Sequence, residues 1–269
     1  MAGVVFVMGL LVLLWGMQEL QRREPRFVAA FFLLLPPLLV PYWARVYQTD
    51  LFHWVKLFSV IAGVLWFTAL RHTRFGKVRW AYYGVFVILA ANILEAVLQD
   101  LSGGHLAHYL NATAGILLIV TLLDRVDSIQ VNADSRFRDL EWGSMTLAWI
   151  IGYTLWNWTF VFLQYPWNAG KHIAVLGAAL LVGLQNPRRW LQARAFTLGT
   201  YLILLFSFPG FIEAGADTRA WSTPTTELLA ASLVLGFMLA YTFWFVLPYL
   251  PVSCPIRKRF LKPTVSVKE

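Results

Sequence analysis

Charged residues are scarce in this chain. Asp, Glu, Lys and Arg together make up 13% of its 269 residues, whereas they account for about a quarter of a typical soluble domain. Hydrophobic residues make up 59%. This balance excludes an ordinary soluble domain and predicts an integral membrane protein. The apolar runs are continuous and do not alternate with polar residues, so we expect spanning helices rather than barrel strands.

Cysteine and the motifs of well-known membrane enzymes are also nearly absent. The single cysteine, Cys254, excludes an intrachain disulfide and a cysteine-based metal site. There is no GxSxG nucleophile motif, no HExxH zinc motif and no repeated histidine box. The net charge of +8 does not indicate nucleic-acid binding, because no basic face carries interleaved exposed aromatic residues. We therefore expect membrane lipids, and no nucleic acid, as partners.

Nine apolar segments are long enough, or nearly long enough, to cross a bilayer. A spanning helix needs about 17 to 25 residues, and the seventh segment reaches this length only if it also takes in the stretch from Trp167 to His172. We therefore predict an all-α bundle of about nine transmembrane helices in one domain, 1–250, followed by a basic tail, 251–269. The segments cover residues 3–20, 27–44, 51–70, 80–99, 105–123, 143–164, 171–185, 193–211 and 226–249.

The basic residues are sorted between the two sides of this predicted bundle. Eighteen of the 22 Lys and Arg residues fall in alternate loops and in the tail, and Arg194, at the start of the eighth segment, is counted with them. Only Arg45, Lys56, Lys171 and Arg219 fall on the other side. The positive-inside rule places the larger set in the cytoplasm. We therefore expect the N-terminus outside, the C-terminus in the cytoplasm, and a location in a cell membrane, that of the bacterial inner membrane.

The fourth and fifth segments form a hairpin whose polar residues are regularly spaced. Three of them share one face of the first helix and three share one face of the second, and the turn between them covers residues 100–104. Folding the hairpin about this turn predicts a polar ladder. Polar groups inside a bilayer are costly and usually mark a functional site. The expected pairs are Gln99 with His105, Glu95 with His108, and Asn92 with Asn111.

Other polar residues are expected in the same outer region. His53 and Lys56 lie in the first turns of the third segment, and Lys171 and His172 begin the seventh. Asn157 lies within the sixth segment between two tryptophans. We expect a pocket whose ligand-binding residues are Asn92, Gln99, Asn111, Asn157, Lys56 and Lys171.

Histidines and a carboxylate at one depth suggest a divalent metal. Imidazole and carboxylate groups commonly bind zinc or iron with one position left open for water. We expect Glu95, His105 and His108 as ligands, with His53 or His172 as a fourth ligand or a supporting group. Two other interpretations stay open. One is general acid–base catalysis by Glu95 and His108 without metal, and the other is hydrogen bonding that only holds the helices together.

The depth of these residues favours a pocket that opens on one side. Secondary transporters usually bind substrate near the midplane, whereas these residues lie within the first turns of the outer surface. Prolines 36, 37 and 41 should kink or break the second segment and admit a lipid headgroup. We therefore predict a membrane-embedded enzyme acting from the extracytoplasmic side on a lipid or other lipophilic substrate, with Glu95 and His108 as catalytic residues. A transporter of a small solute or ion, and a non-catalytic scaffold or sensor, are the alternatives.

Overall fold

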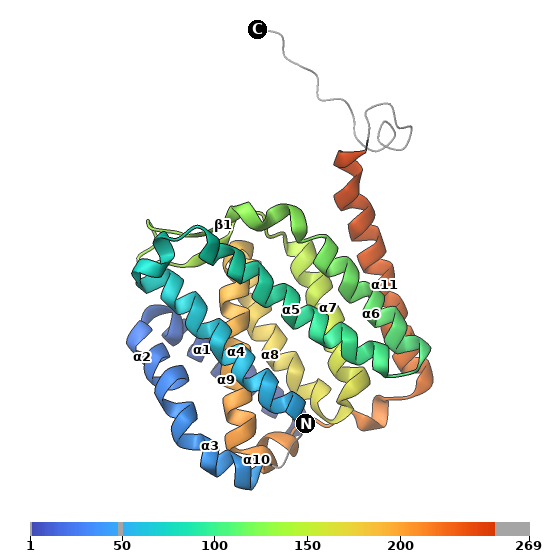
Figure 1. Cartoon of the computed structure of the whole chain (residues 1–269). Helices are drawn as coiled ribbons and strands as arrows, with labels where there is room; N and C mark the ends of the chain where they lie inside the picture. Colours follow the sequence, from blue (N-terminus) through green and yellow to red (C-terminus); the bar gives the residue numbers. More distant parts are fainter. Residues whose placement is uncertain (1, 48–50, 251–269) are drawn as a thin grey trace.

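The computed structural model describes residues 2–47 and 51–250, without the side chains of 123–125 (Figure 1). The predicted basic tail, 251–269, and Cys254 lie outside the described residues. The described chain is almost entirely helical and contains one short β-hairpin. The all-α class predicted from composition is therefore confirmed for this part of the chain.

Each predicted segment overlaps one helix or one continuous helical run, except that the eighth, 193–211, crosses a break at Phe208 between two helices. Six of them are long and apolar enough to cross a membrane, namely α1, the run 25–46, α4, α5, α8 and the run 224–249. A crossing by all nine, and the orientation of the bundle, stay predictions. The main helices are α1 (Ala2–Arg23), α2 (Pro25–Ala29), α3 (Leu35–Val46), α4 (Leu51–His72), α5 (Trp80–Ser102), α6 (Leu106–Val120), α7 (Leu147–Gln164), α8 (Pro166–Gln185), α9 (Trp190–Ser207), α10 (Pro209–Glu213) and α11 (Pro224–Val246).

The second segment does not break at its prolines. It is helical from α2 through a π-helical turn, η1 (Ala30–Leu34), into α3. Pro36 and Pro37 lie at the boundary between η1 and α3, and Pro41 lies inside α3. The irregularity is therefore a wider turn before the prolines, and the expected break that would admit a headgroup is not formed.

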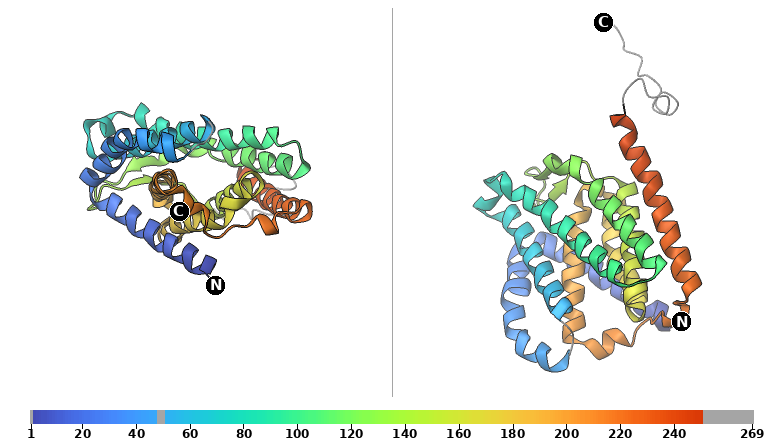
Figure 2. Two further views of the ribbon diagram at one scale, coloured as in Figure 1. Left: turned by 90° about the horizontal axis from the view of Figure 1, so that it is seen from below. Right: turned by 45° about the vertical axis from the view of Figure 1, so that its right-hand side comes forward.

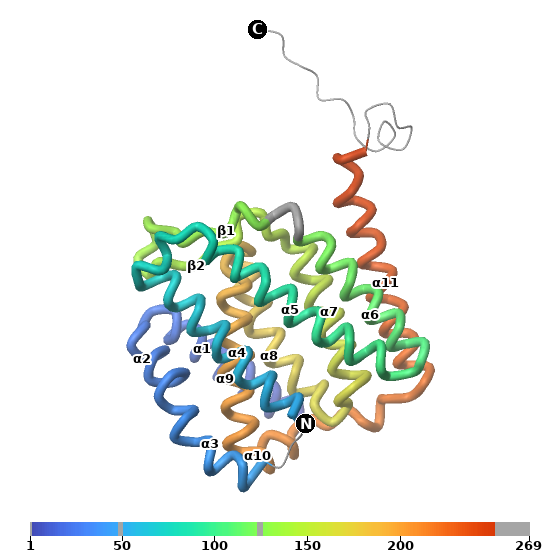
Figure 3. The backbone as a smooth tube through the Cα atoms, viewed as in Figure 1, coloured from blue at the N-terminus to red at the C-terminus, as the bar shows by residue number. Residues whose placement is uncertain are grey.

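The connections are short, apart from the loop between α6 and α7. This loop forms η3 (Leu123–Ser128) and an antiparallel pair, β1 (Ile129–Val131) and β2 (Leu140–Trp142), with Gln130 opposite Glu141. The pair lies at one end of the bundle, here called the β end (Figure 3). The α5–α6 turn lies at the opposite end, here called the turn end. The remaining short elements are η2 (Arg74–Lys77), η4 (Pro187–Arg189), η5 (Arg219–Trp221) and η6 (Leu247–Tyr249).

Helices α8 and α9 lie in the middle of the bundle. Seen from the turn end, they lie between a row formed by α4, α5 and α6 and the single helix α1, while α11 flanks α6 and α7 (Figure 2). All but two residues of α9 are buried, whereas only four residues of α11 are. Side chains on the central helices are therefore shielded from whatever surrounds the bundle.

The buried apolar residues form two separate clusters. The first contains chiefly residues of α5, α6, α7 and α11, and the second chiefly residues of α1, α3, α9 and the part of α4 nearest the turn end. Helix α8 contributes to both. Polar side chains of the central helices lie between the two clusters, and the candidate site described next is formed there.

Candidate functional site

The α5–α6 hairpin has a different register from the predicted ladder. The buried face of α5 runs through Val85, Leu89, Ile93 and Val97 to Asp100. Helical spacing therefore turns Asp100, rather than the predicted polar residues, toward α6. Asn92, Glu95 and Gln99 share a neighbouring face of α5, so their expected pairs with α6 are wrong.

Asp100 is the residue of α5 that meets the polar face of α6. Its Oδ2 accepts a hydrogen bond from Asn111 Nδ2 at 2.7 Å, and its Oδ1 lies 3.1 Å from His108 Nδ1. Gln164 of α7 also donates to Oδ1, at 3.2 Å. A side chain at Gly103 would collide with the His108 ring, since a Cβ there would lie 2.6 Å from its Cγ. This cluster ties three helices together and holds His108 against Asp100 rather than Glu95.

The three polar residues of α5 contact α4 and the end of α7 instead. Lys56 Nζ donates to Asn92 Oδ1 at 2.6 Å and to Glu95 Oε2 at 3.0 Å. Gln99 Nε2 donates to the hydroxyl of Tyr165 at 2.5 Å. Glu95 is thus an ion-pair partner of Lys56, and Glu95 and His108 belong to separate clusters. The predicted catalytic pair is not brought together.

The five predicted metal ligands are likewise spread over different contacts. His172 Nε2 lies 2.9 Å from Asn157 Oδ1, and the His53 ring packs against that of Tyr165 with centroids 5.4 Å apart. His105 lies beside His108, with ring centroids 6.2 Å apart. In the part of the chain that the structure describes, no three His, Cys, Asp or Glu side chains are grouped so that they could hold a metal ion. The arrangement predicted for zinc or iron is therefore not formed.

Lys171 serves a different purpose from the predicted one. Its ammonium group is fully buried and donates to the backbone carbonyls of Trp167, Glu213 and Gly215, the last at 2.7 Å. The N–H of Thr218 also donates to the carbonyl of Pro166, at 3.3 Å. These bonds fasten the segment that follows α9 to the start of α8. Lys171 is a structural residue and does not line the cavity described next.

A cavity of about 80 Å³ lies between α4, α5, α7, α8 and α9. It is called the polar cavity here for the polar side chains in its wall, although most of the wall is apolar. Of the residues predicted for a pocket, His53, Lys56, Asn92, Asn157 and His172 line it. A volume of this size has room for several water molecules or for a small polar group. The sequence therefore identified about half of the polar wall. It missed Asn168, Arg194 and Tyr201, which complete the wall from α8 and α9.

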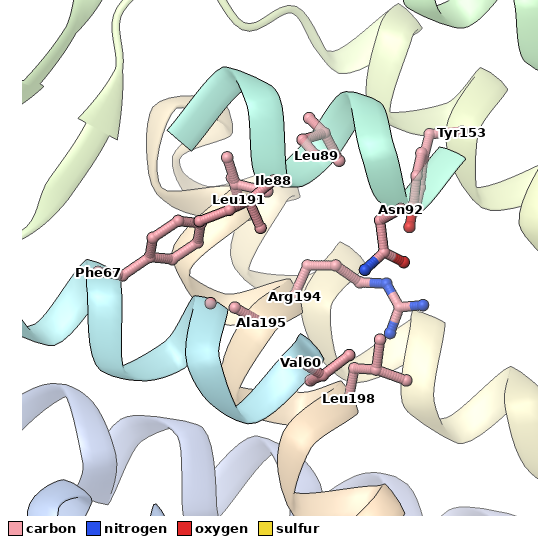
Figure 4. A pocket seen from close by; sticks show the side chains of 11 residues that line it. Val60, Phe67, Ile88, Leu89, Asn92, Tyr153, Leu191, Arg194, Ala195 and Leu198 are labelled. Carbon is pink, nitrogen blue, oxygen red and sulfur yellow. The ribbon is translucent and has the colours of Figure 1, made fainter. Parts of the chain in front are cut away.

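Arg194 dominates the charge of this cavity. Its side chain extends from the second turn of α9 toward Asn92 and Tyr153 (Figure 4), and the residue is only 4% exposed. Its Nη2 donates to Asn157 Oδ1 at 3.1 Å, the same oxygen that faces His172. Its Nε and Nη1 are buried and have no hydrogen-bond partner. Within the described residues, no carboxylate lies within ion-pair distance of this guanidinium.

Two of the residues that the sequence analysis missed, Asp100 and Arg194, were missed for different reasons. Asp100 was assigned to the turn, although it continues the apolar spacing of α5 by three residues after Val97, and extending that spacing would have found it. Arg194 was counted with the basic loop residues. It follows Trp190 by one helical turn and lies between two alanines, which is a weak sign that it belongs to the helix.

Comparison with known proteins gives a family and no function. No curated protein matches the chain, and no solved structure matches it. The model of one family matches residues 1–249, which is nearly the whole chain and includes every residue of the cavity. The chain therefore belongs to the family of unknown function DUF5692.

Proposed function

We propose that this chain is a membrane-embedded protein that binds an anionic ligand in the cavity around Arg194. The observation that carries the proposal is the buried guanidinium with two unpartnered nitrogens, Nε and Nη1. A buried charge without partners is strongly unfavourable and is usually paired. Such a group is best explained by a partner that is supplied from outside the chain.

The balance of charge in the cavity supports an anion rather than a cation. Two basic side chains, Lys56 and Arg194, interact electrostatically there, and both also act on His172. Glu95 compensates Lys56 at 3.0 Å, which leaves the charge of Arg194 uncompensated by the described residues. A carboxylate or a phosphate would accept hydrogen bonds from Arg194 and neutralise it, because guanidinium groups bind both anions well.

The proposal concerns binding and assigns no catalytic step. The enzyme hypothesis required Glu95 and His108 to act together, and each has a different partner. Lys56, Asn92 and Asn157 keep the ligand-binding role expected of them, now beside Arg194. Gln99, Asn111 and Lys171 leave the ligand set, because they do not line the cavity and their bonds hold protein groups elsewhere.

Thermal unfolding of the purified protein tests the proposal. A ligand that binds only the folded protein raises its stability as the ligand concentration rises. We expect sodium butyrate or sodium phosphate to raise Tm in a saturable way, relative to sodium chloride at equal ionic strength. Arg194→Gln should abolish this rise. The matched control is Arg188→Gln, because Arg188 is exposed and lies six residues earlier, and it should leave the rise unchanged.

Two results would overturn the proposal. One is the absence of a saturable rise with either anion in the wild-type protein. The other is an equal rise in wild-type protein and in the Arg194→Gln variant, which would place the anion elsewhere on the surface.

A further inference from the structure

The polar cavity continues into a narrow apolar slot. The slot has a volume of about 40 Å³ and lies between α4, α5 and α9. It shares Asn92, Arg194 and Leu198 with the polar cavity. Arg194 therefore lies where the two spaces meet. The rest of the slot is apolar except for Tyr153, and much of its wall comes from Val60, Phe67, Ile88 and Leu191.

The change from polar to apolar lining residues follows the same direction on two helices, α4 and α5. On α4, residues 52–56 line the polar cavity and residues 60–67 line the slot. On α9, Arg194 and Leu198 line both spaces, Leu191 and Ala195 line only the slot, and Tyr201, Leu202 and Leu205 line only the cavity. On α5, residues 92–96 line the cavity and 88–92 the slot. The polar part thus lies toward the turn end and the apolar part toward the β end.

We propose that the ligand is a single-chain amphiphile, with a carboxylate or phosphate head at Arg194 and Lys56 and an alkyl chain in the slot. This inference rests on the proposed function and specifies its ligand class. A small inorganic anion would satisfy Arg194 but would leave the slot without an occupant. An alkyl chain gains free energy there because the walls remove its surface from water.

The width of the slot favours one chain rather than two. Gly63 lines the slot, and a Cβ at this position would lie 3.2 Å from Ile88 Cγ2, which is already tight. Ala195, the other small residue of the wall, lies one residue after Arg194. Helices α4, α5 and α9 thus enclose a thin space, and a larger side chain at Gly63 or Ala195 would fill it.

A series of alkyl carboxylates tests the inference. Binding of butyrate, hexanoate and octanoate to purified protein is measured at free concentrations determined by equilibrium dialysis, with hexyl and octyl phosphate as a second series. Each CH₂ group buried in the slot should tighten binding by about threefold to fourfold. Gly63→Leu should keep the affinity for butyrate and lose the gain from butyrate to octanoate.

The matched control is Gly236→Leu, because Gly236 lies on α11 with no atom within 4 Å of its added Cβ. This variant should keep the full gain. Ala195→Leu is the second slot variant. If Gly63→Leu does not fold, the gain in affinity with chain length is measured in Ala195→Leu instead, and it should be lost there.

Each outcome separates the two proposals. Arg194-dependent butyrate binding without a gain from longer chains would overturn the amphiphile and leave the anion site standing. An equal gain in affinity with chain length in the wild-type protein and in both slot variants would also overturn the amphiphile proposal, since the alkyl chain would then lie outside the slot. Dihexanoyl phosphatidate that binds as tightly as octyl phosphate would overturn the single chain. No binding of any anion would overturn both proposals.

Discussion

Arg71 and Arg194 are both buried arginines in this bundle, and their surroundings differ sharply. Arg71, at the β end, is completely buried and donates to three backbone carbonyls, those of Arg22, Phe137 and Arg138, at 2.6 to 3.0 Å. Arg194 makes one hydrogen bond, to Asn157. A residue that only supports the fold is expected to be well satisfied, and Arg71 leaves one nitrogen, Nη1, without a hydrogen-bond partner, whereas Arg194 leaves two. The comparison indicates that Arg194 is positioned to bind a ligand rather than to support the fold.

The β end also supplies a countercharge that the cavity lacks. Asp139 accepts hydrogen bonds from Arg22 at 2.7 and 2.9 Å, from Ser135 at 2.7 Å and from Gln192 at 3.2 Å. Asp139 lies within electrostatic range of Arg71 as well. Burial by itself would raise the pKa of Asp139, yet the bonds from Arg22 and Ser135 and the charge of Arg189 hold this pKa well below its usual range. The cations of the β end are therefore compensated within the chain.

The largest expected effect is the loss of this countercharge. Asp139→Asn should destabilise the protein by about 3–5 kcal/mol, since removing one partner of a buried charge pair strands the other. Unfolding in mixed micelles measures the change. Asp134→Asn, at an exposed position of the same loop, is the control. Equal stability of the two variants would show that the β end does not depend on compensation, and the comparison with Arg194 would fail.

Lys171 is another buried cation, and its hydrogen-bond acceptors are all backbone carbonyls. Lys171→Met should cost about 2–3 kcal/mol, because buried carbonyls of Glu213 and Gly215 would lose their donor. It should leave anion binding in place. The exposed Lys77 provides the control variant Lys77→Met. Loss of anion binding in Lys171→Met, with stability unchanged, would assign Lys171 to the site instead.

The Arg194→Gln substitution should change the free energy of unfolding in the opposite direction when no ligand is present. Removing an uncompensated buried charge should stabilise the ligand-free protein by about 1 kcal/mol, as expected where a binding site is maintained at a cost to stability. The same unfolding assay, run without added anions, measures the change. A loss of several kcal/mol would contradict the prediction and show that Arg194 is a structural residue like Arg71.

The smallest effect is expected from pH. A carboxylate whose pKa is lowered in the folded state contributes stability that is complete above its ordinary value of 3.8 and is lost as pH falls toward the lower folded value. Between pH 5 and pH 7 this group should change stability by about zero. Below about pH 4 the difference between wild type and Asp139→Asn should shrink. A difference that grows on acidification would contradict the sign of the shift.

The helices were easier to predict than the site. Continuous apolar runs located each helix, and the start of α8 at Pro166 agrees with the extension through Trp167 to His172 that its length required. The rotation of each helix about its axis was harder. A difference of one residue, between Gln99 and Asp100, decides which group faces α6. The long side chain of Arg194 also carries its charge away from its backbone position, which spacing alone does not reveal.

The division of the apolar core into two clusters has a consequence for motion. The bonds from Lys56 to Glu95 and from Arg194 to Asn157 join helices of the second cluster to helices of the first. An anion that binds Lys56 and Arg194 would compete with these bonds, so occupancy and the relative position of the two halves should be coupled. Such a coupling is a shear motion, in which the two packed halves of the bundle slide past each other along the layer of polar side chains between them. Hydrogen exchange of α5 and α7 that responds to butyrate in wild type, and not in Arg194→Gln, would detect it.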